Sequence, residues 1–338
     1  MSAPIVTGLL AYGMSGRVFH APFLSTDSQF KMKAVVERNQ KKMAADYPEI
    51  ISYNSVEEIL ADDEIELIIV NTPNFTHFDF ATQALRAGKH VLIEKPAAGN
   101  VTELHELFDI ARQAGKQVFC YQNRRWDSDF LSFKEVIESG RLGKLTEVSL
   151  RWDRYKPQLN PKPFKETKDT PINGIVYELG PHLIDQAIHL FGKPLSFDKL
   201  TTIQRENSEV PDYVTFRLTY PAGLVVHITS GLLTPDPLPS FVAHGALGSY
   251  SKHRADVQEL QLNAGILPTD DAYGIEPAGM EGKLVTIGID GEKSIEFTPS
   301  IKGDYTNLFY AVYHAIRDKA LYPITEEHMA WQMELLQD

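Results

Sequence analysis

Short apolar runs separated by amphipathic segments organise the first third of the chain. The runs cover residues 5–11, 32–36, 50–53, 67–70, 90–93 and 118–121, and each has the length of a buried strand. Between the later runs, apolar residues recur at helical spacing, as they do at Leu104, Leu107 and Ala111. Strands alternating with helices predict right-handed βαβ units around a doubly wound parallel sheet.

Capping signals define one of these helices. Asn100 followed by Glu103 has the form of a capping box, and Gly115 suits the end of the helix that begins there. A second helix is expected over residues 76–87, ended by Gly88. The α/β rhythm is therefore supported by local signals as well as by periodicity.

The pattern changes after residue 121. One long helix is expected over residues 178–191, and the remaining apolar runs follow one another without helices between them, at 145–152, 200–204, 214–220, 224–229 and 241–244. Such runs predict an α+β domain with an open, mostly antiparallel sheet. We therefore expect two domains, 1–122 and 123–338. The chain from Thr306 is helical again, and this C-terminal helix is expected to pack back on the first domain.

Composition narrows the class of partner. The 338 residues carry 33 Lys and Arg against 45 Asp and Glu, a net charge of −12. This balance argues against nucleic acid or an anionic membrane as a partner. Cys120 is the single cysteine, so an intrachain disulfide is excluded and a reducing compartment, by default the cytoplasm, is expected. No apolar run approaches the ~20 residues of a membrane span.

The first turn carries a phosphate-binding motif. Residues 11–16, Ala-Tyr-Gly-Met-Ser-Gly, match G-x-G-x-x-G with Ala11 in the first position. Gly13 would let the backbone approach a pyrophosphate, and Gly16 would let the following helix pack closely on the strand. Because the motif lies between a strand and a helical segment, it predicts a dinucleotide-binding (Rossmann) domain. The residues expected to contact the cofactor here are Tyr12, Gly13, Met14, Ser15 and Gly16.

The end of the second strand gives two opposed signals on the cofactor. Glu37 lies about 20 residues past the glycines, where an acid holds the ribose 2′-hydroxyl of NAD. Arg38 is the residue type that accommodates the 2′-phosphate of NADP. If Glu37 turned away, Arg38 would favour NADP. The sequence leaves NAD and NADP open.

Polar and charged residues follow the other strands at the carboxyl edge of the predicted sheet, where ligands bind in open α/β folds. The fifth strand ends in Glu94-Lys95-Pro96, and the proline stiffens the turn that carries the lysine. Asn74 is equally well explained as a helix cap. The residues expected to face the cofactor from this edge are Asn71, Thr72, Pro73, Asn74, His77, Glu94, Lys95, Pro96 and Asn123.

The predicted long helix carries a stripe of ionisable residues. Glu178, His182, Asp185 and His189 recur at i, i+4, i+7 and i+11, which would place them on one face. Pro181 suits the first turn of a helix, which would place Glu178 just before that helix. Such a stripe is a solvated face, a metal site or an acid–base wall. Cysteine and a fourth spaced ligand are missing, so we expect no metal. His182 is the best candidate for proton transfer, with the flanking carboxylates orienting it.

These motifs together resemble the Gfo/Idh/MocA family of NAD(P)-dependent oxidoreductases. The likeness covers essentially the whole chain. The stretches 20–22 (His-Ala-Pro), 123–130 and 182–191 look like the bacterial scyllo-inositol dehydrogenase branch and its uncharacterised relatives. The resemblance implies that Lys95 contacts nicotinamide and substrate, often across a cis peptide to Pro96. It also implies that His182 is the catalytic histidine, that Glu178 occupies a position that is usually aspartate, and that Asp185 matches the acid three residues later.

The function expected from these features is hydride transfer between a nicotinamide and a secondary alcohol of a sugar or cyclitol. His182 would remove the hydroxyl proton and Lys95 would polarise the alkoxide, with Glu178 beside them. Arg124, Trp126, Tyr155 and Asp185 would line the substrate pocket, although core packing explains Trp126 equally well. The alternatives are an NAD-dependent glycosidase on the same fold and a cofactor-binding regulator without turnover. A homodimer or homotetramer formed through the C-terminal sheet is also expected.

Overall fold

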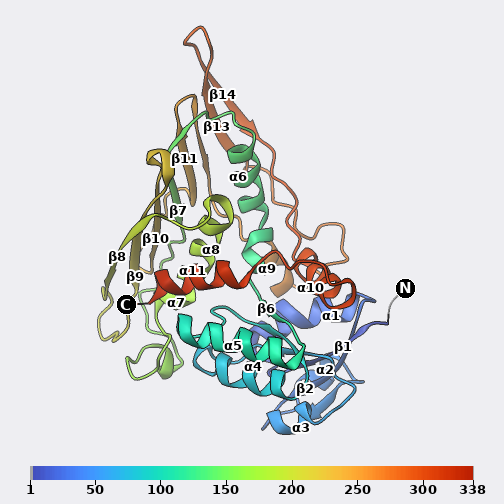
Figure 1. Cartoon of the computed structure of the whole chain (residues 1–338). Helices are drawn as coiled ribbons and strands as arrows, with labels where there is room; N and C mark the ends of the chain where they lie inside the picture. Colours follow the sequence, from blue (N-terminus) through green and yellow to red (C-terminus); the bar gives the residue numbers. More distant parts are fainter. Residues whose placement is uncertain (1–2, 338) are drawn as a thin grey trace. The chain divides into compact units, whose positions relative to one another are not determined.

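The chain folds into two compact units in a computed structural model that describes residues 3–337 (Figure 1). The first unit contains the chain up to Asn123 together with the segments Gln258–Tyr273 and Tyr305–Met333. The second contains Arg124–Val257, Gly274–Asp304 and the residues from Glu334 onward. Two late segments of the chain thus belong to the first unit.

The first unit is built on a parallel sheet of six strands in the order β3-β2-β1-β4-β5-β6. The strand order reverses between β1 and β4, which makes the switch point where ligands bind in doubly wound folds. The predicted Rossmann sheet is confirmed. Its strands are β1 (Ile5–Leu9), β2 (Phe30–Val36), β3 (Ile51–Tyr53), β4 (Leu67–Val70), β5 (His90–Ile93) and β6 (Val118–Cys120).

Helix α5 (Val101–Ala114) of this unit begins at a short polar side chain that caps it. The Asn100 side chain accepts a hydrogen bond from the amide of Glu103 at 2.8 Å, and Gly115 ends the same helix in the left-handed region at φ 63°. The helices are α1 (Ala21–Thr26), α2 (Met43–Asp46), α3 (Val56–Leu60), α4 (His77–Arg86) and α5 (Val101–Ala114), with single turns η1 (Gly16–His20, a π-helix) and η2 (Asn74–Thr76).

The C-terminal part of the chain returns to this sheet. Helices α9 (Val257–Asn263), α10 (Thr306–Asp318) and α11 (Glu326–Leu336) supply most of the late segments. In α10, Phe309 stacks on Phe23 with ring centroids 5.0 Å apart, and Arg317 forms an ion pair with Glu66 at 2.7 Å. These apolar and charged contacts are what ties α10 into the first unit.

The second unit is built on a sheet of eight strands in the order β14-β13-β12-β11-β7-β10-β9-β8. All neighbouring pairs are antiparallel except β7 and β10, so the prediction of a mostly antiparallel sheet is confirmed. The strands are β7 (Leu145–Arg151), β8 (Ser196–Thr202), β9 (Tyr213–Thr219), β10 (Val225–Gly231), β11 (Phe241–Gly245), β12 (Gly248–Lys252), β13 (Gly282–Ile287) and β14 (Lys293–Thr298).

Helices α6 (Ser128–Glu138) and α8 (Gly180–Phe191) lie on the same side of this sheet (Figure 1). Buried aromatic side chains of α6 pack on the sheet, as where Phe133 meets Phe241 at 5.4 Å. The long helix expected over residues 178–191 is instead two. The four-residue α7 (Ile175–Glu178) ends before α8 begins, with Leu179 between them. Glu178 therefore lies before the helix that carries His182, as Pro181 in the first turn of α8 allowed, and not on one continuous helical stripe with it.

None of the helices in residues 3–337 has the length and apolar character needed to cross a membrane. Cys120, at the end of β6, is buried.

Candidate active site

The fingerprint turn of the first unit has the shape that a dinucleotide needs. A Cβ atom on Gly16 would lie 2.4 Å from the Ala11 carbonyl oxygen and 2.9 Å from Nδ2 of Asn71, so only glycine fits there. Gly13 is exposed, and no heavy atom lies within 4 Å of where its Cβ would be. The backbone at Gly13 is thus open to a phosphate, and the close helix–strand contact falls at the third position of the motif. The residues present fit a bound dinucleotide.

Asn71 and His77 brace the neighbouring turns. The Asn71 amide accepts from the Ala11 N–H at 3.0 Å and donates to the Ala11 carbonyl at 2.8 Å. The fully buried His77 ring lies between the carbonyl oxygens of Pro96 (2.7 Å) and Thr72 (2.9 Å). Burial lowers the pKa of His77, an effect those carbonyls oppose. These side chains were predicted to face the cofactor, but their polar atoms hold the loops that would surround it.

Glu37 is turned into the protein. Its carboxylate accepts hydrogen bonds from the amides of Lys42 (2.8 Å) and Met43 (3.2 Å) and from the hydroxyl of Ser52 (2.8 Å). The residue is only 8% exposed. The predicted contact between Glu37 and a ribose hydroxyl does not fit this geometry, because the carboxylate stabilises the first turn of α2 instead. The neighbouring Arg38 is exposed.

The turn after β5 joins the fingerprint loop to Lys95. Glu94 Oε1 accepts hydrogen bonds from the Ser15 hydroxyl at 2.5 Å and from His20 Nε2 at 3.0 Å. Burial would raise the pKa of Glu94, but the hydrogen bond and charge of His20, the Ser15 hydroxyl and the Lys95 ammonium together hold it at about 2. Lys95 itself is half-buried, and its peptide bond to Pro96 is cis, as the resemblance implied.

Among the remaining residues predicted to contact the cofactor, two form hydrogen bonds with side chains of the protein, and two differ in their exposure. Tyr12 donates its hydroxyl to Asp46 at 2.6 Å, and the hydroxyl of Thr72 pairs with that of Thr76 at 2.6 Å. Met14 is largely exposed and Asn123 is buried. Asn74 is the first residue of η2, whose cap is Pro73, so the alternative of Asn74 as a helix cap is not supported.

In the second unit, His182 packs against an aromatic side chain that the sequence did not single out. Its ring centroid lies 5.4 Å from that of Trp152, and both residues are buried. The guanidinium groups of Arg254, Arg124 and Arg154 lie 4.1, 4.8 and 5.1 Å from the Trp152 ring. Such cation–π contacts fix the plane of the indole, and the indole in turn fixes the face of the His182 ring.

Buried acids accompany these arginines. Arg124 forms ion pairs with Asp256 and, at 3.5 Å, with Asp127, and Arg254 lies 3.6 Å from the same Asp127. Burial raises the pKa of Asp127 to about 7. Arg124 is only 4% exposed. Within this unit, Arg124 belongs to a cluster of buried charges next to Trp152. The sequence predicted a substrate contact for Arg124 and not this cluster.

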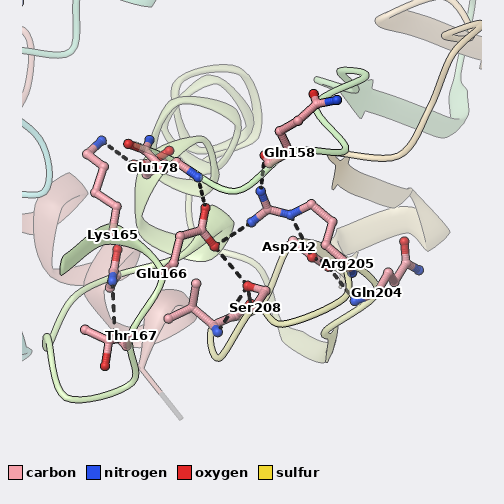
Figure 2. A network of polar contacts seen from close by, with 12 residues as sticks. Gln158, Lys165, Glu166, Thr167, Glu178, Gln204, Arg205, Ser208 and Asp212 are labelled. Atoms are coloured by element: carbon pink, nitrogen blue, oxygen red, sulfur yellow. Dashed lines mark hydrogen bonds and ion pairs between the residues drawn. The ribbon is translucent and has the colours of Figure 1, made fainter. Parts of the chain in front are cut away.

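Glu178 lies at a cavity of about 310 Å³ lined by Tyr155, Lys165 and Arg154 among others, all in the second unit. Glu178 forms an ion pair with Lys165, and both side chains are partly exposed (Figure 2). Tyr155, predicted as a substrate residue, is 59% exposed on this lining. The cavity thus brings together two of the predicted residues, Glu178 and Tyr155, with a lysine that the sequence analysis missed.

A buried network holds the loop that presents Lys165. Arg205 donates to Asp212 at 3.0 Å and to Glu166 at 2.8 Å, and Ser208 also donates to Glu166 at 3.0 Å (Figure 2). Arg205 and Asp212 are almost fully buried. Because Glu166 follows Lys165 directly, the network fixes the backbone beside the cavity. In the sequence, only the adjacent Lys165 and Glu166 in a proline-rich stretch could have indicated this part of the site. The network itself could not be predicted, because Arg205 lies 39 residues after Glu166 in the chain.

Comparison with known proteins agrees with this geometry. Residues 6–122 match the family model described as "Oxidoreductase family, NAD-binding Rossmann fold", and residues 130–251 match "GFO/IDH/MocA C-terminal domain". The scyllo-inositol 2-dehydrogenase (NADP(+)) IolW of Bacillus subtilis is 36% identical over 96% of this chain and 89% of its own length. The uncharacterised oxidoreductase YdgJ of Escherichia coli is 33% identical over 100% of this chain and 96% of its own. The structure of the oxidoreductase yvaA from Bacillus subtilis superposes with a TM-score of 0.94 at 34% identity, covering 99% of this chain and 95% of the other.

Proposed function

Because the chain belongs to the Gfo/Idh/MocA family of NAD(P)-binding oxidoreductases, we propose that it transfers hydride between NADP and a secondary alcohol or ketone of a cyclitol or sugar. The observation that carries the proposal is the Ser15–Glu94 hydrogen bond, which ties the phosphate-binding turn to the turn that bears Lys95. In the second unit, His182, buried against Trp152, supplies the acid–base group, and Glu178, at a cavity, supplies a carboxylate for binding the substrate.

The role of each residue in the proposed reaction follows from the chemistry of its side chain. A bound nicotinamide supplies the hydride acceptor or donor. His182 takes the proton of the substrate hydroxyl, since an imidazole changes charge near neutral pH. Lys95 stabilises the developing alkoxide by its positive charge. Glu178 accepts a hydrogen bond from a second hydroxyl and so orients the ring.

NADP is favoured over NAD by the orientation of one carboxylate. Glu37 would repel a 2′-phosphate if it pointed outward, but it caps α2 from inside the protein. Arg38 and Lys42 remain as exposed cations after β2. A guanidinium suits a phosphate because its planar fork matches the phosphate oxygens. The NADP(+) label of the Bacillus relative supports the same choice.

The substrate class proposed is a polyol in the size range of an inositol. The cavity at Glu178 combines an ammonium, a carboxylate and a tyrosine, which are hydrogen-bonding groups suited to hydroxyls. The relative named as a scyllo-inositol dehydrogenase supports a cyclitol. The single buried thiol of Cys120 supports a reducing, cytoplasmic setting, where NADP would be available.

A panel of inositols and sugars, run with NADP and NAD in parallel and followed at the absorbance of reduced nicotinamide, tests the proposal. We expect turnover with at least one cyclitol or sugar and a preference for NADP. His182→Ala and Lys95→Met should each lower the rate, by roughly 10²–10⁴-fold for His182. Absence of turnover with every polyol, or unchanged rates in both variants, would overturn the proposal. A glycoside in the panel that is cleaved without net NADPH formation would point to the glycosidase alternative.

A second copy of this chain is the proposed macromolecular partner. On the outer edge of the eight-stranded sheet, Ile295 and Phe297 are 54% and 66% exposed, beside Ile287 at 45%. Apolar side chains grouped on a sheet edge are typical of subunit contacts. Sedimentation equilibrium should therefore give a mass of two or four chains, and Phe297→Glu should lower it. A monomer at micromolar concentration would contradict this part of the proposal.

A further inference from the structure

His20 is a buried histidine with a defined polar contact, and the reaction proposed above assigns it no task. It is the last residue of the π-helical turn η1, directly after the fingerprint loop, and precedes Ala21 and Pro22 at the start of α1. Its side chain is completely buried. In the sequence, residues 20–22 were notable only because they resemble the scyllo-inositol dehydrogenase branch of the family.

The ring of His20 makes one hydrogen bond within the part of the chain that the structure describes. Its Nε2 lies 3.0 Å from Oε1 of Glu94, while its Nδ1 is buried there without a hydrogen-bond partner. A nitrogen facing a carboxylate oxygen carries the hydrogen, so His20 donates and Glu94 accepts. The ring centroid of His20 lies 4.4 Å from that of Tyr121, in a tilted arrangement, and 6.2 Å from that of Phe309, in an edge-on arrangement.

The same carboxylate oxygen also accepts from Ser15. Ser15 belongs to the loop that would hold the pyrophosphate, and Glu94 is followed directly by Lys95. The Glu94 side chain therefore joins the phosphate-binding loop to the turn of the proposed catalytic lysine, and His20 sets its orientation from the buried side. A charged group held by two donors in a low-dielectric setting resists movement, because losing one donor leaves the charge poorly satisfied.

We propose that His20 is a positioning residue for cofactor binding and for Lys95, acting through Glu94. The part that concerns Lys95 rests on the proposed function, whereas the part that concerns the fingerprint loop needs only that the protein binds a dinucleotide. Loss of the His20 donor frees Glu94, loosens its hold on Ser15 and weakens binding of NADPH.

The competing explanation is that His20 only fills space between Tyr121 and Phe309. Two substitutions separate the explanations. His20→Phe keeps an aromatic ring of similar size but removes the donor, and His20→Gln keeps an N–H donor of similar reach but removes the ring. A packing role predicts that phenylalanine is tolerated and glutamine is not. A positioning role predicts the reverse order.

The experiment titrates the full-length protein and its variants with NADPH, following the fluorescence of the reduced nicotinamide, and records thermal unfolding without cofactor. We expect the NADPH dissociation constant of His20→Phe to rise about tenfold, and that of His20→Gln to stay within about threefold of wild type. Tyr121→Phe, which removes a hydroxyl bonded to Phe19 in the same cluster, should bind NADPH as the wild type does. Wild-type binding by His20→Phe, or weaker binding by His20→Gln than by His20→Phe, overturns the proposal.

A second measurement applies if His20→Phe fails to fold. Ser15→Ala removes the other donor to Glu94 from an exposed loop, and it should also weaken NADPH binding. Combined with His20→Gln, which keeps the donor, it should bind NADPH within about threefold of Ser15→Ala alone, because Glu94 still has its buried-side donor. Combined with His20→Leu, which removes that donor, its effect should be less than additive, because both residues act on one carboxylate. Full additivity of Ser15→Ala with His20→Leu counts against the proposal. Where a polyol substrate is found, kcat should fall in His20→Phe and recover in His20→Gln. Wild-type protein that binds NADPH but turns over no polyol would contradict the proposed function and leave the binding comparison intact.

Discussion

Arg125 holds Asp185 in a two-pronged ion pair inside the second unit. Its Nε donates to Oδ2 and its NH2 nitrogen donates to Oδ1, both at 2.7 Å, and the two side chains are 2% and 5% exposed. Both oxygens of Asp185 are thus engaged by the protein. The carboxylate predicted to contact substrate instead anchors α8, the helix that carries His182, to the segment before α6.

This pairing predicts a loss of stability when one partner is removed. Arg125→Met should lower the free energy of unfolding by about 3–5 kcal/mol, because it leaves a buried carboxylate without its counter-ion. The control is Arg217→Met, which breaks the exposed pair with Asp198, 60% and 69% exposed, and should cost less than about 1 kcal/mol. Urea unfolding monitored by fluorescence measures both. Equal costs for the two variants would contradict a structural role for the buried pair.

The orientation of Glu37 predicts how cofactor choice responds to mutation. Arg38→Ala should lower the ratio of kcat/KM for NADP to that for NAD by about tenfold to a hundredfold, since a charge-assisted contact to the 2′-phosphate is lost. Glu37→Gln should leave the ratio nearly unchanged and lower the thermal stability, because it weakens the hydrogen bonds that start α2. Lys31→Ala, at an exposed position earlier in β2, is the control. A ratio that follows Glu37 rather than Arg38 would restore the interpretation of Glu37 as a ribose contact.

The parallel sheet was predictable because each buried strand is a short apolar run. Gly13 and Gly16 added to this, because they lie in the loop between the first strand and the following helix, where glycines at this spacing allow a dinucleotide to bind. The turn bearing Lys95 followed for the same reason, as it ends one of those runs. The strands β12, β13 and β14 were not found. Most of their residues are polar or exposed, so no apolar run marks them.

The orientation of side chains lay beyond the sequence. Glu37 has the spacing of a ribose ligand, but the amides of Lys42 and Met43 compete for its carboxylate, and their position depends on where α2 begins. The stripe from Glu178 to His189 assumed one helix, and the break at Leu179 separated its first member. Trp152 reads as an ordinary strand-end aromatic until the fold brings it against His182.

The Lys165–Glu178 pair predicts a residue that affects substrate and not cofactor. Lys165→Met should raise KM for the polyol about tenfold, since one charge-assisted hydrogen bond to a hydroxyl is lost and Glu178 loses its counter-ion. The dissociation constant of NADPH should not change. Lys162→Met, three residues earlier on the same loop and exposed, should behave as wild type in steady-state kinetics. An unchanged KM in Lys165→Met would remove Lys165 from the substrate site.

The depressed pKa of Glu94 predicts how stability depends on acid. Its folded-state pKa is about 2 against an ordinary value of 4.5, with burial opposed by His20, Ser15 and Lys95. A carboxyl with a lowered pKa stabilises the folded state above its unfolded pKa, and this contribution is lost as pH falls through the folded pKa. The window therefore runs from about pH 4.5 down to about pH 2, and the loss within it approaches about 1.4 kcal/mol per pH unit.

Urea unfolding of wild type and Glu94→Gln at pH 6, 5, 4 and 3.5 measures this dependence. The wild type should be the more stable protein at pH 6, and the difference should begin to shrink below about pH 4.5, because only the wild type must keep a carboxylate ionised while its unfolded state takes up a proton. Glu49→Gln, an exposed carboxyl near the start of β3, provides the background titration. If the free energies of unfolding of wild type and Glu94→Gln changed in parallel with pH, His20 and Ser15 would not be holding the carboxylate in its charged form. The proposed link between the phosphate-binding loop and Lys95 would then lose its electrostatic basis.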